Sequence, residues 1–213
     1  MSRDPSSAAV ELPPLPALPR APTRRQVGRI RVALWLLSGL FLTGAIGTLG
    51  LRRDRRELSW VFSFGQPLLW MVLALVMLRL ATSSSPERWK VRFAAVLIPL
   101  LLAASSLWTE SGPSSLTAQG VSAVRGALVC GFSTLLLGAG PAAASVLALR
   151  RAFADDAAWR GAVVGACCGL AGAAVMHLHC AVASGWHGLL AHALPTVILA
   201  AAGAWAASRW LRA

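Results

Sequence analysis

Acidic residues are scarce in this sequence of 213 residues. Only 8 residues are Asp or Glu, charged residues make up 13 % of the chain, and 56 % is hydrophobic, with a mean hydropathy of +0.64. In soluble domains roughly a quarter of the residues are charged. So few charges cannot solvate a protein surface. The composition therefore excludes a soluble enzyme and indicates an integral membrane protein.

Motifs of the common enzyme classes are also missing. The chain has no Cys-x-x-Cys pair of the kind that disulfide-exchange enzymes use, and no Gly-rich phosphate loop followed by lysine. No carboxylate is placed to complete a Ser-His or Cys-His set inside a membrane. Four cysteines do not make a disulfide scaffold in a chain of this length. We therefore expect no enzymatic activity and no bound cofactor.

Six apolar runs are present instead, and each is long enough to be a membrane-spanning helix. They cover residues 32–51, 60–80, 93–108, 126–149, 161–183 and 188–207. Crossing the hydrocarbon core takes about 20 apolar residues in a helix, and the runs lack the alternation of a β-barrel. No cleavable signal peptide is visible, so we expect the first run to be retained. The predicted fold is an all-α polytopic membrane bundle of six transmembrane helices.

The distribution of basic residues predicts the orientation of this bundle. The chain carries 20 Lys and Arg and a net charge of +12. Fifteen of these residues fall in the two termini and in the second and fourth loops, and five fall in the loops of the opposite side. Since basic loops stay in the cytoplasm, we predict that both termini are cytoplasmic. The domains are then a tail over 1–31, the bundle over 32–207 and a short tail over 208–213.

The segment RRDRRE at 52–57 is the exception to this pattern. It places four arginines in the first loop, on the side that otherwise has few basic residues. A short hairpin loop can cross with its helices, helped by Asp54 and Glu57. The alternative is a different threading of the first hairpin.

Small residues and prolines within the runs indicate close helix packing. Gly161, Gly165 and Gly169 recur at four-residue spacing, which lets another helix approach. Gly39, Thr43 and Gly47 do the same in the first run. Four prolines lie in four different runs and predict kinks there, with the freed carbonyls bonded by neighbours: Pro67, Pro99, Pro141 and Pro195.

Ionisable side chains are missing from the middle of the predicted spans. Coupled transporters need such groups, yet no Asp or Glu lies well inside any of the six runs. This argues against a proton- or cation-coupled carrier. A passive channel stays open as an alternative.

Cys130 and Cys180 are the two cysteines that the predicted topology places near the outer face. That compartment is oxidising, so a disulfide between them is chemically reasonable. Redox or metal sensing and inert packing are equally open for this pair. Cys167 and Cys168 lie in the other half of the fifth run and resemble packing residues.

Histidines surround Cys180 in the stretch MHLHC. His177 and Cys180 share one helical face, His179 lies on another side, and His187 and His192 follow at the start of the sixth run. Imidazole and thiol groups suit Zn or Cu, although the spacing is not that of a structural zinc site. His177, Cys180 and His187 are therefore weak metal candidates, and hydrogen-bonded interfacial histidines are the favoured alternative.

The sizeable segment outside the membrane is the N-terminal tail, whose centre reads ELPPLPALPRAP. Leu12, Leu15 and Leu18 recur every third residue among prolines and form one ridge of a polyproline II helix. The basic stem that follows begins with Arg20, Arg24 and Arg25. Such a segment cannot fold alone but docks into a partner's groove at little ordering cost. The alternative is a disordered tail whose arginines bind lipid.

The chain resembles the NrsF-type membrane anti-sigma factors of bacteria. The likeness rests on the tail LPPLPALPRAPTRR, on a cysteine opening the fourth helix, here Cys130, and on the stretch GPAAASVLALRRAFADDAAWRGAVVGACCGLAGAA followed by LHC. These family members have six predicted helices and a short cytoplasmic tail. After Cys180 the chain departs from the family, because AVASGWH stands where Pro and acidic residues are common.

The resemblance implies a function. Proteins of this type hold an extracytoplasmic-function sigma factor at the bacterial inner membrane and release it on a stress signal, using two cysteines that correspond to Cys130 and Cys180. We predict that Leu12, Leu15, Leu18, Arg20, Arg24 and Arg25 bind the sigma factor and that Cys130, Cys180 and His179 sense the signal. The expected partners are a sigma factor, the bilayer and a possible second copy of the chain, but not nucleic acid.

A second resemblance bears on the signal, and two alternative functions remain open. The Ala- and Arg-rich style is also similar to the myxobacterial anti-sigma protein of light-induced carotenoid synthesis, which implies light or singlet oxygen as the signal. The alternative functions are a small transporter or channel, for instance for a metal ion near His177, Cys180 and His187, and a cofactor-binding membrane redox subunit.

Overall fold

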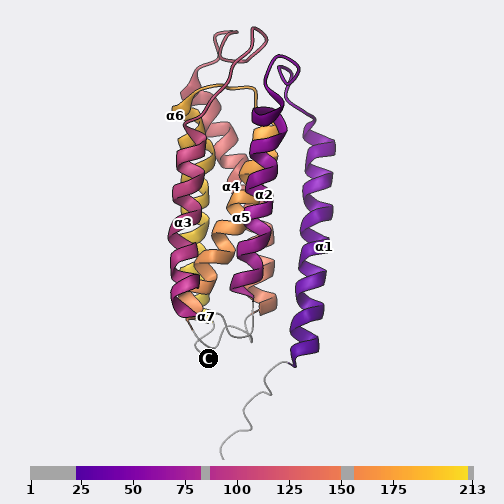
Figure 1. Ribbon diagram of the computed structural model, residues 1–213, viewed down its shortest axis with the longest axis vertical. Helices are drawn as coiled ribbons and strands as arrows, with labels where there is room; N and C mark the ends of the chain where they lie inside the picture. Colours follow the sequence, from indigo (N-terminus) through magenta and orange to yellow (C-terminus); the bar gives the residue numbers. More distant parts are fainter. Residues whose placement is uncertain (1–22, 83–86, 150–155, 211–213) are drawn as a thin grey trace, which may run out of the picture.

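The computed structural model describes residues 23–82, 87–149 and 156–210, and in these ranges it contains helices and connecting segments but no strand. The helices run side by side along one axis (Figure 1). Their bounds are α1 Arg24–Leu49, the π-helical turn η1 Val61–Gly65, α2 Gln66–Ala81, α3 Arg88–Ser106, α4 Ala123–Leu149, α5 Ala157–His179, α6 Gly185–Gly188, the π-helical turn η2 Leu189–Ala193 and α7 Leu194–Trp210. The predicted all-α bundle is confirmed.

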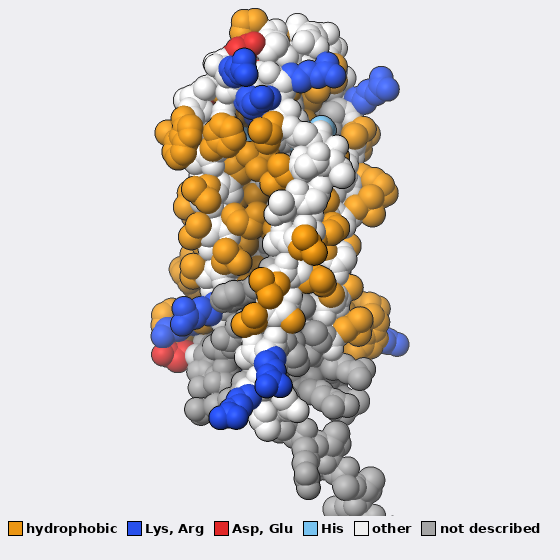
Figure 2. All heavy atoms as spheres, turned by 90° about the vertical axis from the view of Figure 1, so that its right-hand side faces the viewer, with side chains coloured by type: hydrophobic (Ala, Val, Ile, Leu, Met, Phe, Trp, Pro, Cys, Tyr) orange, Lys and Arg blue, Asp and Glu red, His pale blue; other side chains and the backbone are white. Residues whose placement is uncertain are grey.

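Five of these helices are long and apolar enough to cross a membrane. They are Val61–Ala81, Trp89–Ser106, Ala123–Leu147, Ala157–His179 and Gly185–Trp210, and α1 contributes a shorter apolar stretch over Leu36–Leu49. On the face shown in Figure 2, hydrophobic side chains cover the middle of the molecule and basic side chains gather toward its two ends. This distribution is the one that a bilayer requires of a protein embedded in it.

Helix α5 forms the centre of the bundle. In its apolar window 83 % of the residues are buried, against 28–44 % in the other four spans. A Cβ atom on Gly165 would clash with the carbonyl of Leu199 in α7, one on Gly161 would clash with Gly203, and one on Gly172 would lie 2.9 Å from the Thr134 carbonyl in α4. The glycine spacing predicted for the fifth run is therefore confirmed as a close-packing surface, used by α7 on one side and α4 on the other.

The corresponding expectation for α1 is wrong. A Cβ atom on Gly39 or on Gly47 would meet nothing within 4 Å outside its own helix. Helix α1 begins with a capping box, in which the Gln26 N–H donates to the Thr23 hydroxyl and the Thr23 N–H donates to the Gln26 side chain. It ends at Gly50, whose φ of +75° favours glycine. Local signals thus set both ends of α1, while its small residues stay open.

At two of the four prolines the helix contains a π-helical turn in place of the predicted kink. Pro67 comes after η1 and Pro195 after η2, while Pro99 and Pro141 lie inside α3 and α4. A proline lacks the N–H that would bond to the preceding turn, and a widened turn accommodates its ring. The carbonyl of Phe62, one turn before Pro67, is bonded instead by the His177 ring nitrogen at 2.9 Å. A neighbouring helix thus satisfies a freed carbonyl, as predicted.

The end of the bundle formed by residues 50–60, 107–122 and 180–184 is here called the loop end, and it lies at the top of Figure 1. Carboxylates tie these connections together. Glu57 accepts bonds from the N–H and hydroxyl of Ser114, and Glu110 accepts bonds from the N–H and hydroxyl of Ser59 at 2.8 and 2.7 Å. The segment after α5 departs from helix at Cys180, so the fifth helix ends before residue 183, where the sequence pattern had extended it.

Close packing of α5 predicts a strong position dependence for added methyl groups. Replacing Gly165 with Ala is expected to cost about 1–3 kcal/mol, because the new Cβ meets the backbone of α7 and neither helix can yield. Gly44→Ala in α1 is the matched control and should not lower stability, because its Cβ would meet nothing within 4 Å. Thermal unfolding of the detergent-purified protein measures both. Equal melting temperatures for the two variants would contradict the central role of α5.

Candidate functional site

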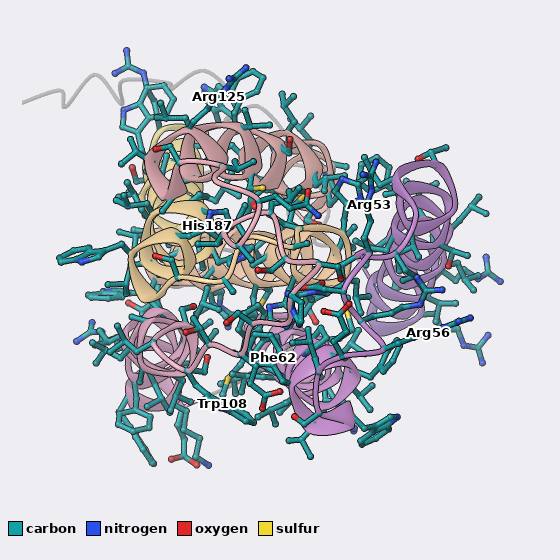
Figure 3. The ribbon with its side chains drawn as sticks, turned by 90° about the horizontal axis from the view of Figure 1, so that it is seen from above. Arg53, Arg56, Phe62, Trp108, Arg125 and His187 are labelled. Carbon is teal, nitrogen blue, oxygen red and sulfur yellow. The ribbon has the colours of Figure 1, made fainter. Side chains whose placement is uncertain are left out.

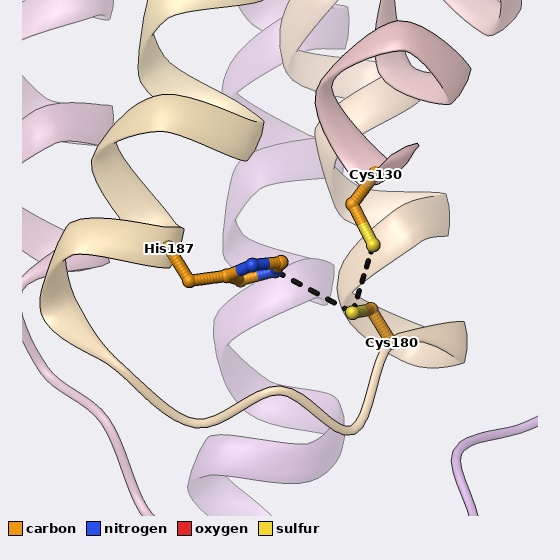
Figure 4. A group of neighbouring side chains, drawn as sticks. All are labelled: Cys130, Cys180 and His187. Atoms are coloured by element: carbon orange, nitrogen blue, oxygen red, sulfur yellow. Dashed lines mark hydrogen bonds between the residues drawn. The ribbon is translucent and has the colours of Figure 1, made fainter. Parts of the chain in front are cut away.

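Two thiols and one imidazole meet inside the loop end. The sulfur atoms of Cys130 and Cys180 are 2.9 Å apart, and the Cys180 sulfur lies 3.4 Å from Nε2 of His187 (Figure 4). The structure records both cysteines as free thiols. All three side chains are buried, and one ligand atom from each lies within 4.8 Å of the others. We call Cys130, Cys180 and His187 the thiol cluster.

Local structure explains how residues so far apart in the chain come together. Cys130 lies in the first turns of α4, on the side that packs against the end of α5. Cys180 directly follows α5, and its N–H still bonds to the Met176 carbonyl while its own backbone is extended. Four residues later the Ser184 hydroxyl accepts the His187 N–H and caps α6. This short return brings His187 back onto Cys180.

A series of rings leads away from the thiol cluster. The ring of His187 lies 5.6 Å from that of His192, which in turn lies 6.2 Å from His177. His177 packs edge-on against Phe62 at 4.8 Å and against Trp70 at 5.3 Å. Seen from above, His187 and Phe62 point into the bundle, whereas Arg56 and Arg125 point outward (Figure 3). His177, His187 and His192 are therefore packed inside the protein, and the His177 ring is also bonded to the Phe62 carbonyl.

A buried ion pair completes the wall of the site. The guanidinium of Arg52 donates two bonds to Asp54, from Nε to Oδ1 at 2.7 Å and from its terminal nitrogen to Oδ2 at 2.9 Å. The side chains are 3 % and 0 % exposed. Arg52 also lies over the Phe62 ring, 5.3 Å from its centroid. Sequence reasoning saw Arg52 as one of four loop arginines that oppose the predicted orientation, and Asp54 as an acid that helps the loop to cross. The signal available in the sequence was Asp54, an acid between two pairs of arginines, which indicates an ion pair with one of them.

Polar atoms without a hydrogen-bond partner face a small cavity beside the cluster. The atoms are Oε1 of Gln66, Oγ of Ser106 and the Nδ1 atoms of His187 and His192. The cavity measures about 20 Å³ and is also lined by Arg52 and Cys180. A space of roughly 10–15 Å³ holds one water molecule when several polar groups surround it. The site is therefore polar and suited to a very small occupant.

Chemically, the cluster is suited to thiol reactions and to soft metal ions. The hydrogen bond donated by the Cys130 thiol, together with the His187 ring, lowers the pKa of the Cys180 thiol. A thiolate is both the reactive nucleophile and the metal-binding form of cysteine. Two thiolates and an imidazole are ligands of Zn and Cu, and three ligands leave one tetrahedral position open. Either a disulfide or a bound metal would fit these residues.

The structure separates the other predicted site residues from the cluster. His179 is not turned toward the thiols, since its Nδ1 lies 3.2 Å from the Gly50 carbonyl. His177 bonds to Phe62, so of the three weak metal candidates only Cys180 and His187 meet, joined by Cys130. Cys167 and Cys168 are buried in the core of α5 as expected for packing residues.

The predicted tail contacts lie mostly outside the described residues. Leu12, Leu15, Leu18 and Arg20 belong to the range that the structure leaves out. Arg24 is the first residue of α1, and Arg25 beside it is exposed.

Comparison of the sequence with known protein families identifies one family that covers most of the chain. The family described as Negative regulator of sigma F, or NrsF, matches residues 17–212. The chain belongs to the NrsF family. The family name indicates a negative regulator of a sigma factor, hence a sigma-factor partner and a regulatory rather than an enzymatic role. Neither a curated protein nor a solved structure matches the chain. The resemblance found in the tail and in the second half of this NrsF protein is thereby confirmed at the level of the family.

The geometry predicts which cysteines react. Treating the purified protein with diamide, a diazene oxidant, should join Cys130 to Cys180 and leave Cys167 and Cys168 unmodified, because only the first two sulfurs are in contact in the structure. Peptide mass spectrometry after blocking free thiols with maleimide measures the linkage. Cys130→Ser should abolish it, and Cys167→Ser should not. A linkage through Cys167 in the wild-type protein would contradict the structure.

Proposed function

We propose that this NrsF protein is a membrane-bound anti-sigma factor. It sequesters an extracytoplasmic-function sigma factor at the bacterial inner membrane and releases it on a stress signal. The observation that carries the proposal is the match of the negative-regulator family over residues 17–212, which include all of the helices. Five helices that are long and apolar enough to cross a membrane support the membrane location.

In the proposed topology α1 is a sixth crossing. It runs alongside the other long helices over most of their length (Figure 1). The loop end then faces the periplasm, and both termini face the cytoplasm, in agreement with the excess of basic residues on that side. The sigma factor, which works in the cytoplasm, then meets the N-terminal tail on the correct side of the membrane. This tail is shorter than the predicted range of 1–31, because α1 already begins at Arg24.

The tail is the proposed sigma-binding segment. Leu12, Leu15 and Leu18 form its apolar ridge, and Arg20, Arg24 and Arg25 supply basic contacts at its end. Proline stiffens the ridge before binding, so little conformational entropy is lost when it docks. The capped start of α1 at Thr23 fixes the point where the tail leaves the bundle.

The thiol cluster is the proposed receiver of the signal. A two-electron oxidant or a soft metal ion acts on the same buried sulfur pair, and the periplasmic side favours both. Light or singlet oxygen, implied by the narrower resemblance to the carotenoid regulator, is a further input to test in the same cells. To go from 99 % bound to 99 % released, the switch needs about 5.5 kcal/mol between its states.

The tail ridge generates the first functional prediction. Changing Leu12, Leu15 and Leu18 together to Asp should free the sigma factor and raise a sigma-dependent reporter at least tenfold, because three charges replace the apolar contact. The protein should stay in the membrane fraction. Changing Ser7, Ala8 and Ala17 to Asp adds the same charge off the ridge and should leave repression intact.

Affinity purification from the host distinguishes this proposal from its main alternative. The full chain should recover a sigma factor, and a chain lacking residues 1–22, which retains all of α1, should not. Unchanged repression by the triple Leu variant would refute the tail contact. If neither chain recovers a sigma factor although both insert properly, a metal channel becomes the better interpretation, and metal uptake into liposomes would test it.

The second prediction concerns the receiver. Cells carrying Cys130→Ser and Cys180→Ser should repress the reporter normally but fail to induce it with diamide or with zinc added outside. Cys167→Ser and Cys168→Ser together form the matched control, since these thiols are buried in the core away from the cluster. Full induction in the Cys130 and Cys180 variant would show that the signal enters elsewhere.

A further inference from the structure

The segment that follows α1 is hydrogen-bonded to the last residues of α5, directly before Cys180. The backbone N–H of Arg52 donates to the Leu178 carbonyl at 2.7 Å, and Nδ1 of His179 lies 3.2 Å from the Gly50 carbonyl. Leu178 and His179 are the two residues before Cys180. The chain that continues α1 is therefore held one and two residues away from a sulfur of the thiol cluster.

The Arg52 side chain also belongs to the wall of the site. It is buried, makes two bonds to the fully buried Asp54, and lines the same cavity as Cys180 and His187. An unpaired charge is strongly disfavoured inside a protein. When the cavity wall shifts, Arg52 and Asp54 are thus expected to move with it as a pair rather than separate.

The body of α1, in contrast, is held loosely. Leu36 and Leu40 are 70 % and 73 % exposed, and an added Cβ on Gly39, Gly44 or Gly47 would touch nothing within 4 Å. Two apolar grooves of about 340 and 500 Å³ run between α1 and α4. Because few described side chains interlock along this contact, α1 can tilt or slide without disrupting the packed centre around α5.

Helix α1 is also suited to carry a movement over a long distance. It is one unbroken α-helix of 26 residues, which corresponds to about 39 Å. Gly50 forms the joint between this rod and Arg52, with a φ of +75°. The other end of the rod begins at Arg24, immediately after the N-terminal tail.

We infer that Arg52 couples the thiol cluster to α1, and that α1 transmits the state of the thiols to the sigma-binding tail. This inference rests on the proposed function. When diamide accepts two electrons and two protons from the Cys130 and Cys180 thiols, it becomes the hydrazine and a sulfur–sulfur bond forms. A disulfide fixes the distance and the dihedral angle between the two side chains, which are separate thiols in this structure. The end of α5 shifts, Arg52 follows, and α1 repositions the tail.

The test replaces the ion pair by neutral groups of the same shape. In the double variant Arg52→Gln and Asp54→Asn, neither partner is left as a buried lone charge. Diamide should still join Cys130 to Cys180, and the sigma factor should still copurify without diamide. Reporter induction by diamide should fall at least fivefold. Arg53→Gln, an exposed neighbour in the same loop, is the matched control and should respond like the wild type.

A second variant tests the coupling without touching the ion pair. Two glycines inserted between Leu49 and Gly50 lengthen the joint and should abolish induction in the same way, with thiol oxidation retained. This variant tests the coupling between the thiol cluster and α1 even if the double variant fails to reach the membrane. Wild-type induction in a variant that inserts and oxidises normally would overturn the coupling.

Hydrogen–deuterium exchange of the unaltered protein gives an independent readout. Oxidation should change the exchange of amides near both ends of α1, and unchanged exchange throughout α1 would also overturn the inference. Failure of the proposed function looks different. In that case the Cys130→Ser and Cys180→Ser protein would still respond to diamide, or no sigma factor would bind the wild-type tail.

Discussion

The close contact of α5 with its neighbours is the constraint on which the other features depend. Glycines at 161, 165 and 172 let the backbones of α7 and α4 approach α5 more closely than any side chain would allow. Between apolar helices in a membrane there is little hydrophobic driving force, so van der Waals packing of small residues holds them together. The position of α5 then determines where its last residues, and with them Cys180, meet α4 and the return to α7.

The loop end shows how a protein with very few acids uses those it has. Asp54 neutralises a buried arginine, and Glu57 and Glu110 bond the connecting segments to one another. None of these carboxylates lies along the middle of a described span. The few acids of the loop end therefore form an organised polar cap over the thiol cluster. The cap keeps the sulfur atoms buried, although they lie close to the end of the bundle.

Regulation, rather than catalysis, agrees with this arrangement. The cluster offers a reversible change, a disulfide or a bound soft metal, next to the attachment of α1. In the proposed anti-sigma factor, the tightly packed centre would stay constant and the loosely held α1 would differ between states. A two-state switch requires two conformations whose relative populations the signal changes.

The sequence by itself determined the all-α membrane-type class of the protein, the approximate extent of its five long apolar helices and the close packing around α5. These depend on local composition and on small-residue spacing, which can be read along the chain. The start of α1 at Arg24, eight residues before the predicted run, was not among them. Membership in the family was visible as a resemblance in the tail and in the second half. The proximity of Cys130 and Cys180 to one face also followed from the order of the spans.

Only the tertiary structure decided which polar residues meet. Arg52 and Asp54 had the appearance of loop charges, and their burial depends on the end of α5 and on Phe62, far away in the sequence. His187 joined the cysteines and His179 turned away because the helix stops at His179, and a helical face cannot be extended past that point. Likewise, the small residues of α1 stayed open, since spacing permits a close contact but a partner helix must be there to make it.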